Sequence, residues 1–196
     1  MAKNKARLGK IGEFMTAVQL MHLGFDVANL NDSIPNMKSV DLLVYDDNLK
    51  RHTLVQVKAS TENTFPVGFD LSVAEDMNKL TDAVTCAFVF VKVDLKGTEP
   101  KYSFYILSRQ QMIDLTYQGH DWYLHKLQRD KEIKRTGIVC IPEEWLQGTD
   151  IKPKRLTGEY FKNPLKGISA KDAWNNIWLD VLVAYLRRVG KSPLPI

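Results

Sequence analysis

The chain has 196 residues, of which 44% are hydrophobic and 26% charged, and its net charge is +4. This composition is typical of a globular protein, and the length suits one α/β domain with a full core but is short for two. No apolar run approaches the roughly 20 residues that a membrane span needs, so none is expected. The basic N-terminus lacks the apolar stretch and cleavage site of a secretory signal, which predicts a cytoplasmic protein without a membrane partner.

Charge is distributed unevenly along the chain. Residues 1–12 carry four Lys/Arg and no acidic residue, and residues 150–196 carry nine Lys/Arg against four Asp/Glu. The stretch between them is acidic, with 14 basic and 19 acidic residues. Basic ends around an acidic middle suit a protein whose arms grip phosphates while carboxylates of the body hold a cation. A scatter of solvated surface charges is the alternative interpretation.

The N-terminal part of the chain is predicted to form a helix followed by strands. Apolar residues recur at helical spacing over residues 7–23. A short strand is predicted over residues 25–30. Two β-rich runs, residues 40–45 and 52–59, are separated by turn-forming residues and are predicted to pair as a hairpin.

The centre of the chain is predicted to alternate helix and strand. Ser72 and Glu75 have the spacing of a capping box, which predicts a helix over residues 72–84. The nearly continuous apolar run over residues 85–93 is typical of a strand buried on both faces of a sheet. A further strand is predicted over residues 102–107.

The last third of the chain gives weaker signals. Ser108 and Gln111 predict the cap of another helix, and residues 137–141 form a candidate edge strand. A last amphipathic helix is predicted over residues 169–188, with Asp172 in its first turn. We expect a main domain over residues 1–145, and over residues 146–196 a basic linker and this C-terminal helix, either in the same domain or as an oligomerisation extension.

Trp174 and Trp178 lie one turn apart on the predicted C-terminal helix. Such aromatic residues can stack on bases, but an apolar stripe on an amphipathic helix more often forms core or a subunit contact. The helix is therefore our candidate for a homodimer contact. The two cysteines, Cys86 and Cys140, lie in apolar surroundings without a second Cys or His at zinc-ligand spacing, and both are predicted to be buried free thiols.

The hairpin register predicts a row of polar side chains. Opposed residues of an antiparallel hairpin have a constant sum of residue numbers, so pairing Tyr45 with His52 places Asp41 opposite Gln56. Opposed residues point to the same face, and alternation along the strand adds Lys58 to that face. The alternative is an exposed polar row at the surface of the sheet.

Glu13 is predicted to join this row from the first helix. It shares a helical stripe with Leu20, which is expected to face the sheet. A carboxylate turned inward needs a partner, which Lys58 or a cation held with Asp41 would supply. Gly12 leaves room for close approach beside Glu13.

The order of these elements resembles the PD-(D/E)xK nuclease superfamily, which includes restriction endonucleases and archaeal Holliday-junction resolvases. The resemblance rests on Gly12-Glu13 in a helix, Ser39–Val44 in one strand and Val55–Ser60 in the next, and it covers about residues 7–107. It implies an α/β fold with a restriction-endonuclease-like αβββαβ core, a mixed central sheet flanked by helices and here a C-terminal helical extension. Gln56 stands where the family usually has a second carboxylate, and Pro35 does not directly precede Asp41.

The resemblance also implies a metal site. The catalytic residues would be Glu13, Asp41, Gln56 and Lys58. Mg²⁺, or alternatively Mn²⁺, would be held by Asp41, Gln56 and the backbone carbonyl of Val57, with Glu13 binding through a water. Lys58 would orient the attacking hydroxide or stabilise charge on phosphorus.

The expected partner is DNA. Ser60 is predicted to contact a backbone phosphate, and two basic arms are predicted to grip the DNA. Their residues are Lys3, Lys5, Arg7, Lys10, Lys152, Lys154 and Arg155.

Three functions follow from these observations. The first is a metal-dependent endonuclease that hydrolyses DNA phosphodiester bonds. The second is a catalytically inactive nuclease-fold module that binds nucleic acid or a protein partner, which Gln56 favours. The third is a structural or regulatory protein without a nucleic-acid partner. Two other signals are rejected: residues 189–192 follow a helix rather than a strand, and His120 and His125 do not share a helical face as metal ligands would.

Overall fold

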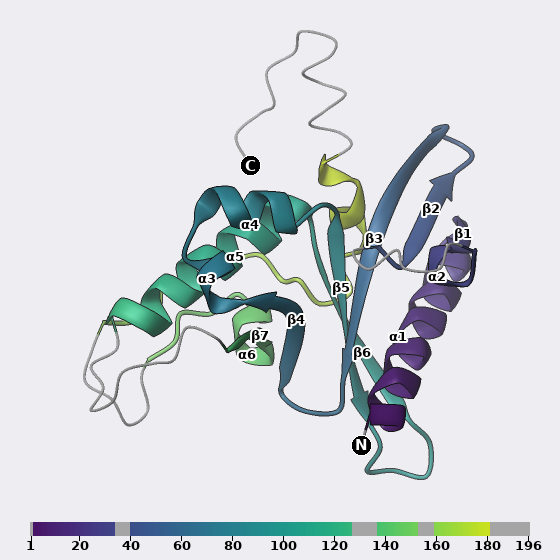
Figure 1. Cartoon of the computed structure of the whole chain (residues 1–196). Coiled ribbons are helices and arrows are strands. Elements are labelled where there is room, and N and C mark those ends of the chain that lie inside the picture. Colours follow the sequence, from purple (N-terminus) through teal and green to yellow (C-terminus); the bar gives the residue numbers. More distant parts are fainter. Residues whose placement is uncertain (1, 34–39, 127–136, 153–158, 181–196) are drawn as a thin grey trace, which may run out of the picture.

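A mixed five-stranded sheet forms the centre of the molecule (Figure 1). The structure is a computed structural model that describes residues 2–33, 40–126, 137–152 and 159–180. The strands lie in the order β1-β2-β3-β5-β6, with β3 and β5 parallel and the other neighbours antiparallel. They are β1 (Asp26–Asn29), β2 (Leu42–Asp46), β3 (Arg51–Ser60), β5 (Ala87–Asp94) and β6 (Lys101–Leu107).

Helices cover both faces of this sheet (Figure 1). One face is covered by α1 (Ala2–His22), which runs along β3. The other carries α3 (Leu71–Ala74), α4 (Met77–Ala83) and α5 (Arg109–Asp121), together with a two-stranded antiparallel sheet of β4 (Thr64–Asp70) and β7 (Ile138–Pro142) and the short α6 (Glu143–Leu146). The remaining described elements are α2 (Leu30–Ser33), the π-helix η1 (Trp122–Lys126) and the 3₁₀-helix η2 (Trp174–Trp178).

The interior strand β5 lies between two hydrophobic cores. Phe88 and Phe90 pack into the core beneath α5, whereas Val89 and Val91 pack into the core that includes Leu20 of α1. Because strand side chains alternate between faces, a strand covered on both sides must be apolar at every position. The apolar run in the sequence therefore predicted this strand correctly.

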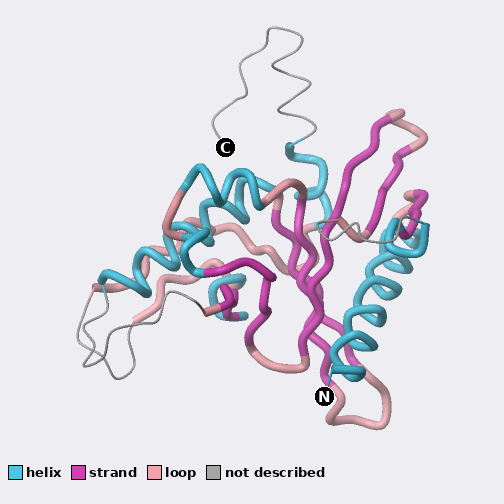
Figure 2. Tube along the Cα trace, in the orientation of Figure 1, coloured by secondary structure: helices cyan, strands magenta, loops and turns pink. Residues whose placement is uncertain are grey.

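The predicted hairpin is confirmed along β2 and β3. The register runs from Leu42 opposite Val55 to Asp46 opposite Arg51 and includes the predicted pair of Tyr45 with His52. Each strand extends one residue further into the predicted turn, because the guanidinium of Arg51 binds the Asp46 carboxylate at 3.1 Å. Figure 2 shows this hairpin projecting as a two-stranded arm beyond the rest of the sheet.

The prediction of a single helix over residues 72–84 is wrong. The segment forms two helices, α3 and α4. Ser72 lies inside α3, and the N-cap of α3 is Asp70. The division occurs at Asp76, whose carboxylate accepts the N–H groups of Asn78 at 3.0 Å and Lys79 at 3.3 Å. A side chain that caps a new helix ends the preceding one.

The predicted start of the C-terminal helix is also wrong. Residues 169–173 are not helical, and regular structure begins only with η2. The backbone here pairs with the edge strand β6: Ile106 N–H donates to the Ala170 carbonyl at 2.8 Å, and Asp172 N–H donates to the Phe104 carbonyl at 3.0 Å. These bonds occupy backbone groups that a helix would need for itself.

Aromatic residues of η2 pack on the chain's own sheet. Ile177 and Trp178 are buried in the core that contains α1, with Trp174 packed against it. The Trp178 ring lies 5.3 Å from the Phe25 ring, and the Arg51 guanidinium lies 4.2 Å from its centroid. These side chains therefore pack in the core of the chain itself. Residues 181–188 of the predicted helix lie outside the described residues, and so does the predicted homodimer contact.

Two smaller findings concern the cysteines and the membrane. Cys86 and Cys140 are both free thiols, as predicted, although only Cys86 is fully buried. Of the helices described here, none combines the length and apolarity needed to cross a bilayer.

Replacing Gly119 with alanine is expected to destabilise the fold. A Cβ at this position of α5 would lie 2.3 Å from the Trp145 ring, which packs directly on the glycine. Because both the ring and the helix are buried, we expect a loss of about 1–3 kcal/mol in the free energy of unfolding. Chemical denaturation measures it, with Gly9→Ala as the matched helical control, since nothing lies within 4 Å of a Cβ there. Equal stability of the two variants would contradict the packing described.

Candidate functional site

Asp41 lies where the pairing of β2 with β3 ends. Its N–H donates to the Val55 carbonyl at 3.0 Å, and the paired residues end with Leu42 opposite Val55, so the predicted opposition of Asp41 and Gln56 lies beyond the strand pairing. Its carboxylate Oδ2 instead accepts the Val57 N–H at 2.7 Å. A side-chain oxygen thus takes the place of a strand carbonyl and holds Asp41 at the edge of β3.

Gln56 and Lys58 lie on the face of β3 that points away from α1. The parallel register with β5 places Gln56 beside Phe88 and Lys58 beside Phe90, on the side of the core beneath α5. The intervening Val57 points to the α1 side. Gln56 is 7% exposed, and Lys58 is half-buried. The predicted alternation is therefore present, and these two polar side chains lie largely inside the protein instead of on its surface.

Glu13 approaches the same strand edge from α1. It is 8% exposed, so the prediction that it faces inward is correct. Its Oε2 accepts hydrogen bonds from Asn29 Nδ2 at 3.0 Å and from Lys10 Nζ at 2.9 Å. The helix lies close to the strand because Gly12 has no side chain, and a Cβ there would come within 2.6 Å of the Ala59 Cβ.

An asparagine amide joins the two carboxylates. Asn31 Nδ2 lies 2.6 Å from Asp41 Oδ1 and 3.4 Å from Glu13 Oε1. Both carboxylates therefore point at one positively polarised group. A point shared by two partly buried carboxylates is also suited to a cation, since each ionised carboxylate keeps further lone pairs after accepting these bonds.

Burial sets the electrostatics of Asp41 and Lys58. Desolvation raises the pKa of Asp41 above its ordinary value, against the effect of hydrogen bonds from Val57 and Asn31 and the charge of Lys58, while Glu13 adds to the rise. Desolvation likewise lowers the pKa of Lys58, and the Asp41 charge opposes that shift. Two ionisable groups whose charged forms are disfavoured by the fold, yet which interact with each other, are typical of functional sites.

Cys86 is a further member of this site. The backbone N–H of Gln56 donates to its sulfur, and burial raises the pKa of the thiol to about 11. The thiol is therefore neutral at physiological pH and is not a nucleophile there. A thiolate at Cys86 would interact electrostatically with Asp41 and Lys58, so the three side chains lie close to one another.

The predicted phosphate contacts are only partly described. Lys5 and Arg7 are exposed on the first turns of α1 and line a groove of about 510 Å³ with Leu8, Ile11, Thr61 and Leu95. The Lys10 ammonium is bound to Glu13, and Ser60 is buried with its hydroxyl accepting the Glu62 N–H at 3.0 Å. Lys152 lies 5.8 Å from the Tyr160 ring centroid. The side chain of Lys3 and residues Lys154 and Arg155 lie outside the described part of the chain.

Sequence reasoning missed the residues that support the carboxylates. Asn29 ends β1 and Asn31 lies in α2, within a stretch that the sequence marks only as strand end and turn. Two asparagines at i and i+2 beside a predicted strand edge were the available signal. Cys86 gave no signal beyond its apolar surroundings.

Replacing Asn31 with alanine is expected to raise the pKa of Asp41 further. Its amide hydrogen bond stabilises the ionised carboxylate and so lowers the pKa of Asp41. An NMR titration of side-chain carboxyl carbons measures the shift, with Asn48→Ala in the exposed hairpin turn as the control. A pKa of Asp41 that is lower in Asn31→Ala, or unchanged, would contradict the hydrogen bond.

The oxygen donors at this edge fit a hard divalent cation. They are the Asp41 and Glu13 carboxylates and the Val57 carbonyl, which faces the β2 side because the N–H and C=O of a strand residue point the same way. No group of three His, Cys, Asp or Glu side chains suited to a metal occurs among the residues described. A cation here would therefore depend on two carboxylates supplemented by neutral oxygens.

Comparison of the chain with models of protein families, with curated proteins and with solved structures finds no match.

Proposed function

We propose that this protein is a metal-dependent endonuclease of the PD-(D/E)xK type that hydrolyses DNA phosphodiester bonds. The observation that carries the proposal is the convergence of Asp41 and Glu13 on the Asn31 amide, beside Lys58. We also propose that the fold has a restriction-endonuclease-like core, because the order of the strands and the position of α1 on β3 are suited to one.

The side chains have separate roles in this reaction. Asp41, Gln56 and the Val57 carbonyl would hold Mg²⁺ or Mn²⁺, and Glu13, fixed by Lys10 and Asn29, would bind through a water. When bound, the metal supplies charge that polarises the scissile phosphate and lowers the pKa of the attacking water.

Lys58 acts on the phosphate itself. Its half-buried ammonium lies close enough to Asp41 for each charge to shift the pKa of the other. In this desolvated place it stabilises the negative charge that builds on the phosphate oxygens. Hydrolysis would leave a 5′-phosphate, as the resemblance implies.

The DNA backbone would lie along the N-terminal end of α1. Lys5 and Arg7 project there, roughly two helical turns before Glu13. The adjoining groove of about 510 Å³ gives the backbone a place beside Thr61. Because Lys5 and Arg7 are cations, the binding of DNA to this surface is expected to weaken as the salt concentration rises.

The experiment is cleavage of supercoiled plasmid and of a branched DNA with Mg²⁺ or Mn²⁺, comparing the wild type with Lys58→Ala and Asp41→Ala. Metal-dependent nicking that both substitutions abolish is the expected result. Nicking that survives both substitutions would overturn the proposed site.

The second candidate is a catalytically inactive nuclease-fold module that binds nucleic acid or a protein partner. The neutral Gln56 favours it, because the site then has two carboxylates where the family usually has three. Absence of cleavage, together with salt-sensitive DNA binding that survives both substitutions, would establish this alternative.

Mg²⁺ affinity is expected to fall on mild acidification. Because the pKa of Asp41 is raised, its carboxylate takes up a proton at a higher pH than an ordinary aspartate, whose pKa is about 3.9. A metal competes with that proton, so affinity decreases as the pH falls through the raised pKa. Calorimetric Mg²⁺ titrations between neutral pH and about pH 4 measure the effect. Constant affinity over that range would contradict the role of Asp41.

A further inference from the structure

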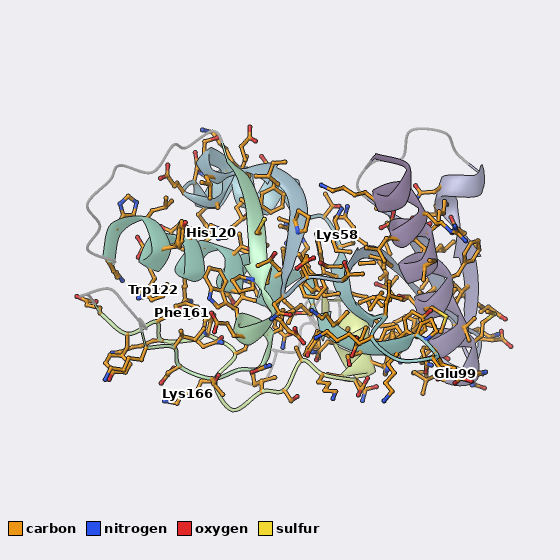
Figure 3. All side chains as sticks on the ribbon, turned by 90° about the horizontal axis from the view of Figure 1, so that it is seen from below. Lys58, Glu99, His120, Trp122, Phe161 and Lys166 are labelled. Carbon is orange, nitrogen blue, oxygen red and sulfur yellow. The ribbon has the colours of Figure 1, made fainter. Side chains whose placement is uncertain are left out.

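A second cavity lies beside the C-terminal end of α5. It has a volume of about 450 Å³, and its walls include His120, Tyr123, Trp145, Leu71 and Ile138. Figure 3 shows His120 well separated from Lys58, so this cavity is distinct from the carboxylate site. Its volume and its largely apolar, aromatic walls are those of a small-molecule site.

His120 presents a hydrogen-bond acceptor in this wall. The residue is 3% exposed, and its Nδ1 lies 2.9 Å from the Thr116 carbonyl. A carbonyl only accepts, so Nδ1 carries the proton and Nε2 keeps its lone pair. Burial also lowers the pKa of His120, which favours the neutral ring. No hydrogen bond joins Nε2 to another residue in the part of the chain that the structure describes, so this acceptor of a cavity-lining residue is left for a ligand.

The aromatic walls suit a flat ring. The His120 ring meets the Trp145 ring edge to face at 5.4 Å, and the Tyr123 ring at 6.5 Å. Trp145 reaches this place because Gly119 leaves room for it. A planar ligand with an N–H group would gain both aromatic contact and the free acceptor.

A polar cleft adjoins the aromatic cavity. It has a volume of about 1000 Å³, and Thr64 lines both spaces. Lys92 in this cleft is held by Asn63 Oδ1 at 2.6 Å and by Glu143 at 3.7 Å. Tyr105 in turn donates to the Glu143 carboxylate at 2.6 Å. These contacts fix the Lys92 ammonium in the cleft beside the apolar cavity, and the cleft walls also carry Lys96 and the carboxylates of Glu62, Asp94 and Glu143.

We propose that the two spaces together bind a purine nucleotide, with the base in the aromatic cavity, a base N–H donating to His120 Nε2, and the phosphate directed to Lys92. A nucleotide combines a flat donor-bearing ring for the aromatic cavity with an anionic group for the Lys92 ammonium. The site needs no divalent metal and is separate from the proposed hydrolysis at Asp41.

Titration calorimetry with AMP on the metal-free protein tests this site. Purine riboside 5′-monophosphate lacks the exocyclic amine of AMP, and we expect it to bind about threefold to tenfold more weakly, since one hydrogen bond is lost. Lys92→Gln is expected to weaken AMP binding about tenfold and to leave adenosine binding unchanged. His120→Phe keeps the aromatic wall and is expected to bind AMP and its analogue equally.

Three results would overturn the proposal. They are no binding of AMP at millimolar concentration, equal binding of AMP and purine riboside 5′-monophosphate by the wild type, and ribose 5-phosphate binding as tightly as AMP. Asp41→Asn is expected to bind AMP like the wild type, so a failure of the nuclease proposal leaves this test intact.

Discussion

Replacing Asp41 with asparagine is expected to lower metal-dependent cleavage by at least about a hundredfold and to raise the melting temperature of the metal-free protein. Asparagine keeps the size of the side chain and one oxygen for the Val57 N–H, which now binds Asp41 at 2.7 Å, but it loses the oxygen that accepts from Asn31 Nδ2 at 2.6 Å. It removes the charge that would hold the cation. Activity and stability should therefore move in opposite directions.

The sign of the stability effect follows from the pKa of Asp41. A raised pKa means that the fold disfavours the ionised carboxylate, so this charge reduces stability at neutral pH. The advantage of Asp41→Asn should shrink as the pH falls through the raised pKa, because the wild type then becomes neutral as well. Thermal unfolding at several pH values measures it, with Asp47→Asn in the exposed hairpin turn as the control. A lower melting temperature for Asp41→Asn would contradict this electrostatic balance.

Replacing Lys58 with methionine is expected to have a second large effect. Cleavage should fall by about a hundredfold or more, because a desolvated positive charge beside the phosphate is lost. Metal binding should persist, since Lys58 is not a ligand. Single-turnover cleavage rates and Mn²⁺ binding, measured on the same preparations, separate these two effects.

The stability of Lys58→Met should exceed that of the wild type at neutral pH. Burial lowers the pKa of Lys58, so the fold disfavours its ammonium form. The difference should decrease as the pH rises through that lowered pKa, where the wild-type side chain loses its charge. Lys101→Met, at an exposed position of β6, is the matched control and should show neither change. Full activity of Lys58→Met would remove Lys58 from the site.

Much of the central sheet was predictable because its signals are local. The hairpin register depends only on turn length, and strand β5 depends only on its apolar run. The capping box of Ser108 and Gln111 is present at the start of α5, with both reciprocal hydrogen bonds formed. Each of these features is encoded in a few adjacent residues.

The errors arose where distant contacts decide the structure. Strand β4 was not predicted because Pro66 and Gly68 interrupt its sequence, and its pairing partner β7 lies about 70 residues later in the chain. Residues 169–173 looked like a helix start but bind β6 instead. Tertiary hydrogen bonds overrode local preference in both places.

The site was predictable in its residue types but not in its support. Glu13, Gln56 and Lys58 lie where the pattern placed them, on a helix and on alternate strand positions. The backbone contact of Asp41 with Val55 and the bridging amide of Asn31 depend on where β2 ends, which no local pattern reports. His120, which the sequence analysis rejected as a metal ligand, is buried in α5.

The most direct test of the cation site is Mn²⁺ binding followed by electron paramagnetic resonance. We expect the wild type to bind Mn²⁺, Lys58→Met to retain that binding and Asp41→Asn to lose it. Absence of binding to the wild type, or equal binding by Asp41→Asn, would contradict a metal-dependent reaction at this site.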